Sequence, residues 1–201
     1  MERIGRKPLQ GVINIIRFNW HFYVLAFALI TFLFFLHKFL PEGLAMILVI
    51  VALLAITGIL VSLIVSWYVY DRSDLYSFNW LNDLNITTGE QIVNINAGFD
   101  ETSSILSEKY PGSRLSVFDF YDPGKHTEIS IKRARKTYPP FPGTQTISTV
   151  SIPLKEKSVA YIFLILSAHE IRSHQERIVF FAQLNRALSE NGRIIVTEHQ
   201  R

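Results

Sequence analysis

The chain has 201 residues, a formal net charge of +3, no cysteine and 49% hydrophobic residues. The absence of cysteine excludes a disulfide framework, an iron–sulfur cluster and a cysteine-ligated zinc site. The positive excess lies in residues 1–72, which hold six basic and three acidic residues, whereas residues 73–201 hold fourteen of each. A nucleic-acid-binding domain needs a basic folded face, and a neutral C-terminal part does not supply one. We therefore expect no nucleic-acid partner.

Two long stretches near the N-terminus lack full charges. The first runs over twenty residues from Phe18 to His37, and the second over twenty-eight from Gly43 to Tyr70. A helix needs roughly 20 apolar residues to cross the bilayer core. Trp20 and Tyr68, near the ends of these stretches, are typical of membrane interfaces. The sequence predicts a transmembrane hairpin, with helices at about 18–38 and 43–69, inside an N-terminal part of residues 1–72.

The first stretch also has one property of a secretory signal, because basic residues precede it. It is longer than a usual signal core, lacks a small-residue cleavage site and is soon followed by a second apolar stretch. A retained anchor therefore fits better. Four basic residues precede the first span and only Lys38 lies in the turn, so the positive-inside rule places both ends in the cytoplasm. We expect a two-pass protein of the inner (cytoplasmic) membrane; the four residues are Arg3, Arg6, Lys7 and Arg17.

Small residues in the second span recur every four positions, at Gly58, Ser62 and Ser66. They indicate either a close-packing stripe between the two helices or ordinary lipid-facing positions. Residues 73–90 form a juxtamembrane linker, in which residues 75–81 predict a short amphipathic segment.

Strands and helices alternate in residues 91–201, which we interpret as one domain. Strands are expected at 92–95, 115–118, 146–150, 160–166 and 193–197. Helices are expected at 101–109, capped by Asp100, at 127–136, and from a capping box of Ser173 and Glu176 to Asn191-Gly192. This alternation, with apolar strands, predicts an α/β, Rossmann-like, doubly wound parallel sheet.

Ligands of such sheets bind outside the carboxyl ends of the strands, at the switch point between the first and fourth strands. The candidate binding residues follow the first, second, third and fourth strands in turn: Asn96, Ala97, Gly98 and Asp100; Asp119 and Phe120; Ser151; and Ser167.

The loop after the first strand does not suit a phosphate. A dinucleotide fingerprint needs G-x-G-x-x-G, but the chain has Asn96, Gly98 and Glu101 at those positions. Asp100 and Glu101 would repel a pyrophosphate, and the sequence has no P-loop. An adenosine ligand with cationic groups and no phosphate fits better, and S-adenosylmethionine is such a ligand. Asp119 stands where an acid accepts hydrogen bonds from both ribose hydroxyls.

From about Ile92 to Glu198 the chain resembles class I S-adenosylmethionine-dependent methyltransferases, of the type that includes quinone methyltransferases. The resemblance rests on motifs in order: residues 92–98, 117–119, 151–162, 168–171 and 184–193. With its anchor and residues 70–76, the chain is similar to bacterial membrane-anchored methyltransferase-like proteins. The resemblance implies S-adenosylmethionine as cofactor. The chain departs from the family pattern at Asn94 and Ala160, where the family has acids, and at Asn96 and Asp100, where it has glycines.

Members of that family continue beyond the fifth strand with a helix and an antiparallel strand pair, whereas this sequence ends at Arg201. We expect a methyltransferase domain that is incomplete after the fifth strand. Residues 194–196 would then form an exposed apolar edge, which an oligomer contact or another partner would cover.

The expected function is that of a membrane-anchored S-adenosylmethionine-dependent methyltransferase, with the bilayer as partner and a lipid or other hydrophobic small molecule as acceptor. His169 is the candidate general base, although a hydrogen bond to nearby backbone is the simpler role. No metal site is expected, because His169 and His174 are five residues apart. The basic run 125–136 fits either a solvated helix face or anionic lipid. The alternative function is a truncated or degenerate methyltransferase-like domain that acts as a binding or interaction module.

Overall fold

The computed structural model describes residues 6–198, and these residues divide into two compact units, 6–80 and 81–198. Arg3, one of the four basic residues behind the expected orientation, lies outside the described residues. The first unit is helical, with α1 (Gln10–Phe18), α2 (Trp20–Leu36) and α3 (Glu42–Trp67). A π-helical turn (Tyr68–Arg72) and two 3₁₀ turns (Asp74–Tyr76 and Asn79–Leu81) follow, in place of one amphipathic segment at 75–81.

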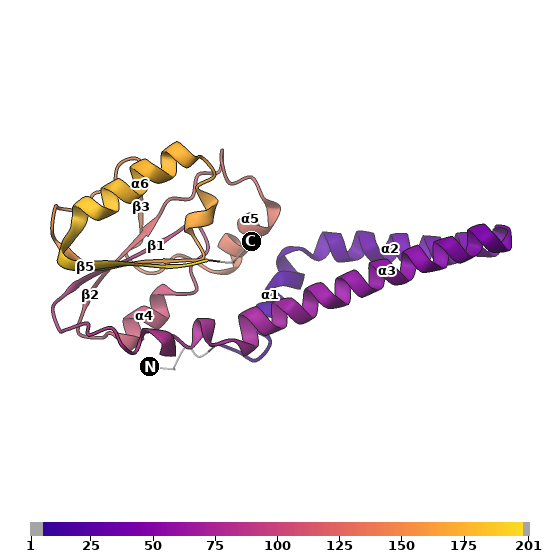
Figure 1. Ribbon diagram of the computed structural model, residues 1–201, viewed down its shortest axis with the longest axis horizontal. Coiled ribbons are helices and arrows are strands. Elements are labelled where there is room, and N and C mark those ends of the chain that lie inside the picture. Colours follow the sequence, from indigo (N-terminus) through magenta and orange to yellow (C-terminus); the bar gives the residue numbers. More distant parts are fainter. Residues whose placement is uncertain (1–5, 199–201) are drawn as a thin grey trace. The chain divides into compact units, whose positions relative to one another are not determined.

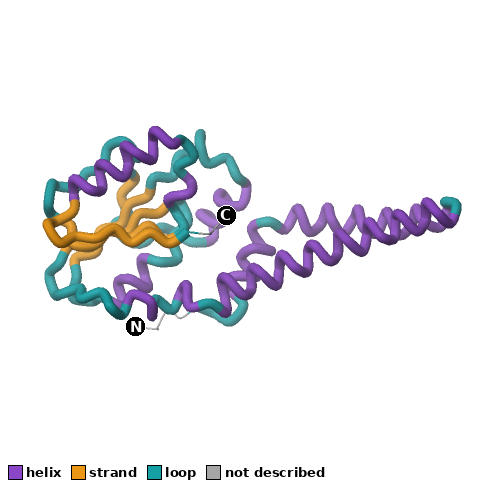
Figure 2. Tube along the Cα trace, viewed as in Figure 1, coloured by secondary structure: helices purple, strands orange, loops and turns teal. Residues whose placement is uncertain are grey.

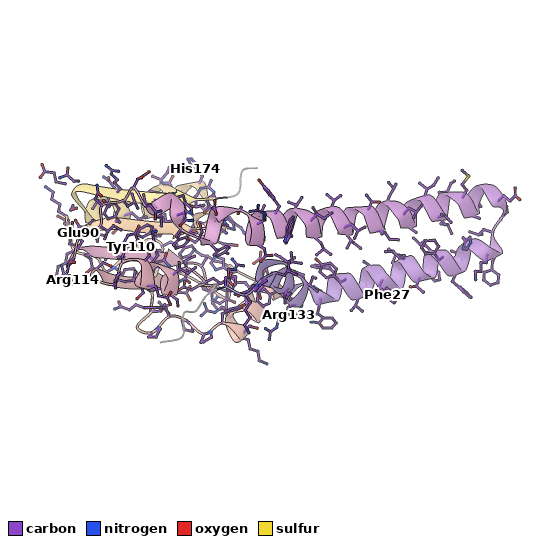
Figure 3. All side chains as sticks on the ribbon, turned by 90° about the horizontal axis from the view of Figure 1, so that it is seen from below. Phe27, Glu90, Tyr110, Arg114, Arg133 and His174 are labelled. Atoms are coloured by element: carbon purple, nitrogen blue, oxygen red, sulfur yellow. The ribbon has the colours of Figure 1, made fainter. Side chains whose placement is uncertain are left out.

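Two helical stretches of this unit have the length and hydropathy of membrane spans. An 18-residue window within Trp20–Phe39 has a mean hydropathy of 2.0, and one within Glu42–Leu81 has a mean hydropathy of 3.1. Core helices of soluble proteins share such composition but bury their apolar side chains. Here 0% of the first apolar window and 6% of the second is buried. Figure 3 shows side chains standing out along both helices, among them Phe27, which is 73% exposed.

The small-residue stripe of the second span does not form a close contact. Nothing lies within 4 Å of the position that a Cβ of Gly58 would take. The buried residue of α3 is Ala52, six residues earlier. For Gly58 the structure therefore supports the second interpretation, an ordinary exposed position.

The second unit is built on a five-stranded sheet in the order β3-β2-β1-β4-β5, with every neighbouring pair parallel. The strands are β1 (Gln91–Asn96), β2 (Arg114–Asp119), β3 (Gln145–Thr146), β4 (Val159–Ile165) and β5 (Leu188–Thr197). The helices are α4 (Ser103–Lys109), α5 (Ile129–Thr137) and α6 (His174–Ala187). Figure 1 shows α6 on one face of the sheet and α4 on the other. The predicted α/β parallel sheet is confirmed.

The core follows the alternation of the strands. Val93 and Ile95 of β1 are fully buried with Phe180 and Leu184 of α6. Fully burying such a side chain stabilises the fold by about 1.5–3 kcal/mol. On the other face, Leu106 of α4 is also fully buried. Apolar strands covered on both sides are typical of parallel sheets.

The element boundaries differ from the expected ones where tertiary contacts decide them. The third strand is only two residues long, and α4 begins at Ser103 rather than Glu101. The last helix ends at Ala187, and Asn191 and Gly192 lie within β5 instead of ending the helix. A Cβ on Gly192 would lie 2.8 Å from the Val159 carbonyl oxygen, where the β4–β5 register shifts. The close backbone approach explains the glycine better than a helix cap does.

Candidate functional site

The loops after β1 and β2 meet at the carboxyl edge of the sheet. Asn96 and Asp119, the last residues of these strands, are register partners. The backbone N–H of Phe120 donates to the Asn96 carbonyl oxygen at 3.0 Å. The chain leaves β1 toward β2 on one side, while β4 pairs with β1 on the other. This is the switch point at which ligands bind in doubly wound sheets; the loops that form this edge are teal in Figure 2.

The turn after β1 has the geometry of a close-approach loop. The Asn96 side-chain oxygen accepts a hydrogen bond from the Gly98 N–H at 3.0 Å, and Gly98 has φ +97°. Asn96 is 5% exposed, and its side-chain nitrogen has no hydrogen-bond partner. Ala97 is buried between them. The turn therefore presents an unsatisfied buried donor beside a glycine, where a ligand could supply an acceptor.

Asp119 is buried, and both of its carboxylate oxygens are engaged. Oδ1 accepts from the Tyr121 N–H at 2.8 Å, and Oδ2 accepts from Arg135 Nη1 of α5 at 2.5 Å. Arg135 also donates to the Gly98 carbonyl oxygen at 3.3 Å and lies over the Tyr121 ring, 4.3 Å from its centroid. The sequence does not single out Arg135, because four other cations surround it in the run 125–136 and nothing in their spacing distinguishes it from them.

Two aromatic side chains adjoin the same loop. Phe99 lies edge-on to Tyr138, with ring centroids 5.2 Å apart. Tyr138 begins the proline-rich loop that follows α5, so this loop is packed onto the residue next to Gly98. Contact with Phe99 is the role that the structure gives this end of the loop.

Asp100 binds the backbone just before α4, but the cap position is Thr102, whose side chain makes no capping hydrogen bond, so the predicted cap at Asp100 lies two residues too early. Asp100 Oδ1 accepts from the backbone N–H groups of Thr102 and Ser103, at 3.0 and 2.9 Å, while Oδ2 is buried without a hydrogen-bond partner. Asn94 holds the same helix end, donating to the hydroxyls of Thr102 and Ser103. The amide that replaces the family acid at position 94 is thus used within the fold.

The remaining predicted binding residues are dispersed. Ser167 donates to the Ile95 carbonyl oxygen at 2.8 Å and so joins the end of β4 to β1. Phe120 is 4% exposed and packs edge-on against Phe180 of α6, in the core. Ser151 is exposed in a turn bridged to Ser148. The structure brings together Asn96, Ala97, Gly98 and Asp119, with Asp100 and Ser167 supporting the same edge.

A cavity of about 540 Å³ adjoins this edge. Its lining comes from three parts of the α/β unit: the loop after β2, the end of β3 with the residues that follow it, and the start of α6. The lining residues are Phe120–Pro123, Lys125 and His126; Thr146–Thr149; and Glu170–Ser173 with Glu176. Glu176 accepts hydrogen bonds from Lys125, at 2.8 Å, and from Thr149. These two contacts, the lysine foremost, lower the pKa of Glu176. The volume is in the range of small-molecule sites.

His169, the candidate general base, lies between two carboxylates. Its Nδ1 is 2.6 Å from Glu198 Oε2, and its Nε2 is 3.3 Å from Glu170 Oε1. Hydrogen bonds to Glu170 and then Glu198 raise the pKa of His169 to about 9. The same contact with His169 lowers the pKa of Glu170. The imidazole therefore carries its proton at neutral pH, which suits a donor or a cation rather than a base.

A titration of the His169 ring by NMR is expected to show a midpoint near 9 in the full chain, and a lower one in Glu198→Gln. Because the folded pKa exceeds the unfolded value of about 6.5, the stabilisation is complete below about pH 6.5. It is lost as pH rises through 9. The side chain is 37% exposed, so the loss is about 0.2–1 kcal/mol. A midpoint near 6.5 would contradict the assignment; the resonance is identified by its absence in His169→Gln.

Gly98→Ala is expected to destabilise the site. An added Cβ would lie 2.8 Å from Tyr121 Cδ2 and 2.9 Å from Arg135 Nη1, on a backbone with positive φ. Such strain costs about 1–3 kcal/mol. Urea unfolding followed by tyrosine fluorescence measures the loss. Gly143→Ala is the matched control, because it has φ +82° but nothing within 4 Å; equal losses would show that φ alone matters.

Among the described residues, no group of three or more His, Cys, Asp or Glu side chains could hold a metal ion. The polar side chains at the edge itself are the buried amide of Asn96, the buried carboxylate of Asp119 and the guanidinium of Arg135.

No family model matches the chain. No curated protein matches it either. Among solved structures it is similar to phosphoethanolamine N-methyltransferase 1 of Haemonchus contortus, in complex with phosphoethanolamine and S-adenosylhomocysteine. The identity is 22%, over 62% of this chain and 25% of that one, with a TM-score of 0.43.

Two further structures show a similar relation. Phosphoethanolamine N-methyltransferase 2 of the same organism is 15% identical, over 59% of this chain and 26% of that one, with a TM-score of 0.40. A S-adenosylmethionine-dependent methyltransferase of Methanosarcina mazei is 14% identical, over 55% and 53%, with a TM-score of 0.41. The chain thus spans about a quarter of the length of the Haemonchus enzymes and about half of the Methanosarcina enzyme.

Proposed function

We propose that the chain is a membrane-anchored S-adenosylmethionine-dependent methyltransferase that acts on a lipid or another hydrophobic acceptor. The observation that carries the cofactor class is the meeting of the Asn96–Gly98 turn with the buried carboxylate of Asp119. A tight turn after the first strand and an acid after the second are what an adenosine ligand requires at a switch point.

The residues present fit that ligand once Arg135 moves away from Asp119. Asp119 would accept hydrogen bonds from the ribose hydroxyls, and the free side-chain nitrogen of Asn96 would donate to a ligand acceptor. Both carboxylate oxygens of Asp119 are already engaged, so the guanidinium of Arg135 must leave Oδ2 first. Arg135 is able to do so, because its side chain is 34% exposed and sits at the end of a flexible stem.

When bound, the cofactor supplies a methyl group activated by its sulfonium, and the protein contributes orientation and exclusion of water. The residues around the turn contribute both. Phe99 and Tyr138 cover the loop after β1, and Ser167 fixes the end of β4 against β1. His169, held between Glu170 and Glu198, keeps its proton at neutral pH and is therefore not assigned the role of general base.

The exposed apolar surfaces of α2 and α3 support the membrane anchor. In a membrane these apolar side chains would contact lipid instead of water. Removing apolar surface from water is favourable by about 25 cal/mol per Å². The proposed orientation places the α/β unit in the cytoplasm. A hydrophobic acceptor follows from the anchor, since an enzyme held at a bilayer meets lipids at high local concentration.

The rival function, a binding module without turnover, has one observation in its favour: Arg135 occupies the carboxylate that the cofactor needs. Calorimetric titration of S-adenosylhomocysteine into the full chain in micelles, followed by transfer of a labelled methyl group to a membrane lipid extract, separates the two. Binding with transfer is the expected result. Binding without transfer to any acceptor favours the rival, and no binding by wild type or Arg135→Gln overturns the cofactor.

The anchor is tested independently of the cofactor. The protein is expected to stay with the membrane pellet after alkaline carbonate extraction. Because the natural chain has no cysteine, Glu156→Cys provides a single thiol on the α/β unit. That thiol should resist a membrane-impermeant reagent in intact cells and react after lysis. Labelling in intact cells would reverse the proposed orientation.

A further inference from the structure

α1 carries an apolar stripe on its exposed side. Leu9, Ile13, Ile16 and Trp20 are 50%, 54%, 38% and 51% exposed. Ile13 and Ile16 lie three residues apart on α1, about 60° apart around a helix of 3.6 residues per turn, and so share one face. Leu9, which has φ 61°, and Trp20, which follows the non-helical Asn19, lie just outside α1 and flank this exposed apolar face at its two ends.

The opposite side of α1 is fixed to the end of α3. Gly11, Asn14 and Phe18 are buried. The Asp71 carboxylate accepts hydrogen bonds from the N–H groups of Gly11, at 2.7 Å, and Val12, at 2.9 Å. The first N–H groups of a helix have no partner within the helix, and the helix dipole favours a negative charge beside them. A Cβ on Gly11 would lie 2.3 Å from Tyr70 Cβ, so only glycine permits this contact.

The charges around the stripe are basic. Lys7 and Arg17 are exposed at its two ends, and no acidic residue occurs between residues 6 and 41. Each basic residue near an anionic leaflet contributes about 1 kcal/mol of attraction. With nine residues, α1 is about 13.5 Å long, too short to cross the roughly 30 Å core of a bilayer.

We propose that α1 is an interfacial helix that lies in the headgroup layer of an anionic bilayer, with its stripe Leu9–Ile13–Ile16–Trp20 toward the acyl chains. We assign the lipid bilayer as the surface that covers the stripe, because the stripe adjoins α2. The helix α2 has no buried residue and is apolar enough to cross a membrane. The inference rests on the membrane anchor of the proposed function. Asp71 is a positioning residue, since it holds α1 by its first turn.

The cysteine-free chain allows single-site labelling. Ile13→Cys and Ile16→Cys, each labelled with an environment-sensitive fluorophore, are reconstituted in phosphatidylglycerol-containing vesicles with lipids brominated on the acyl chain. We expect at least twofold quenching at both positions. Phe27→Cys on α2 is the reference for a position within the membrane span. Glu156→Cys on the α/β unit is the reference for a position in water.

The outcomes separate the two proposals. Quenching at position 27 without quenching at 13 and 16 overturns the interfacial helix and leaves the anchor intact. No quenching at position 27 overturns the anchor itself. Protection of positions 13 and 16 from both lipid bromine and aqueous iodide also overturns the inference, because it would mean that protein covers the stripe.

Asp71→Ala gives a second measurement. Loss of the carboxylate frees the first turn of α1, so the label at position 13 should become at least twofold more accessible to iodide. Asp74→Ala is the control, since Asp74 lies on the next turn and its bonds from Ser77 go to its backbone carbonyl oxygen, which the substitution keeps. Equal effects of the two variants would contradict the role of Asp71.

Discussion

Replacement of Asp119 by asparagine is expected to weaken S-adenosylhomocysteine binding about 10- to 100-fold. The change keeps the shape of the side chain but removes the charge that would accept the ribose hydroxyls. Hydrogen bonds to a charged group contribute about 1.5–3 kcal/mol, and 1.4 kcal/mol corresponds to a factor of ten. Isothermal titration calorimetry on the full chain measures the change directly.

Asp122→Asn is the matched control for this variant. It makes the same change of charge three residues later, at an exposed carboxylate that accepts only from the Gly124 N–H. The control should bind like the wild type. If Asp119→Asn also binds like the wild type, Asp119 serves only to hold Arg135, and the ribose contact is wrong.

Arg135→Gln is expected to act in the opposite direction and to tighten S-adenosylhomocysteine binding about tenfold. The wild-type ligand must first displace a guanidinium that donates to Asp119 Oδ2 at 2.5 Å, whereas the variant has no charge to displace. A hydrogen bond to a charged group contributes about 1.5–3 kcal/mol, and the ligand of the variant does not have to replace this one. The same substitution should lower the free energy of unfolding by about 1–3 kcal/mol, because it leaves a buried carboxylate without its cation.

Opposite signs for binding and stability are the signature of a side chain that competes with the ligand. Lys132→Gln removes one positive charge from the exposed side of the same helix and should change neither quantity by more than about twofold or 0.5 kcal/mol. Weaker binding in Arg135→Gln would instead identify Arg135 as a ligand contact. That result would leave Asp119 and the Asn96–Gly98 turn in place as the binding edge.

Local chemistry made several features predictable. Ser173 accepts from the Glu176 N–H at the start of α6, and Asp100 accepts from the Ser103 N–H at the start of α4, because such bonds join residues within three positions of each other. The Glu176 carboxylate does not complete the predicted capping box, since it accepts from Lys125 and Thr149 instead. The burial of β1 and β4 follows from their apolar runs, which only a sheet covered on both faces can accommodate. The two uncharged stretches likewise correspond to two exposed apolar helices.

The features that the sequence did not predict depend on partners far away in the chain. α1 begins without a local cap, and its first N–H groups are satisfied by Asp71, about 60 residues later. Pairing of Arg135 with Asp119 depends on how α5 lies beside β2, and the three cations of 132–135 are indistinguishable by spacing. His169 acquires its raised pKa partly from Glu198, which β5 brings within 2.6 Å.

Composition and order along the chain thus determined that a basic, helical, apolar N-terminal part precedes a neutral α/β unit, and that Asn96 and Asp119 stand at the carboxyl ends of its first two strands. Only the tertiary structure decided what those residues do. The carboxylate of Asp119 is satisfied by Arg135, the amide of Asn96 retains a free donor, and His169 is charged. The physical reason is that periodicity and caps act over a few residues, whereas the state of a buried polar group is fixed by whichever distant partner the fold places within hydrogen-bonding distance.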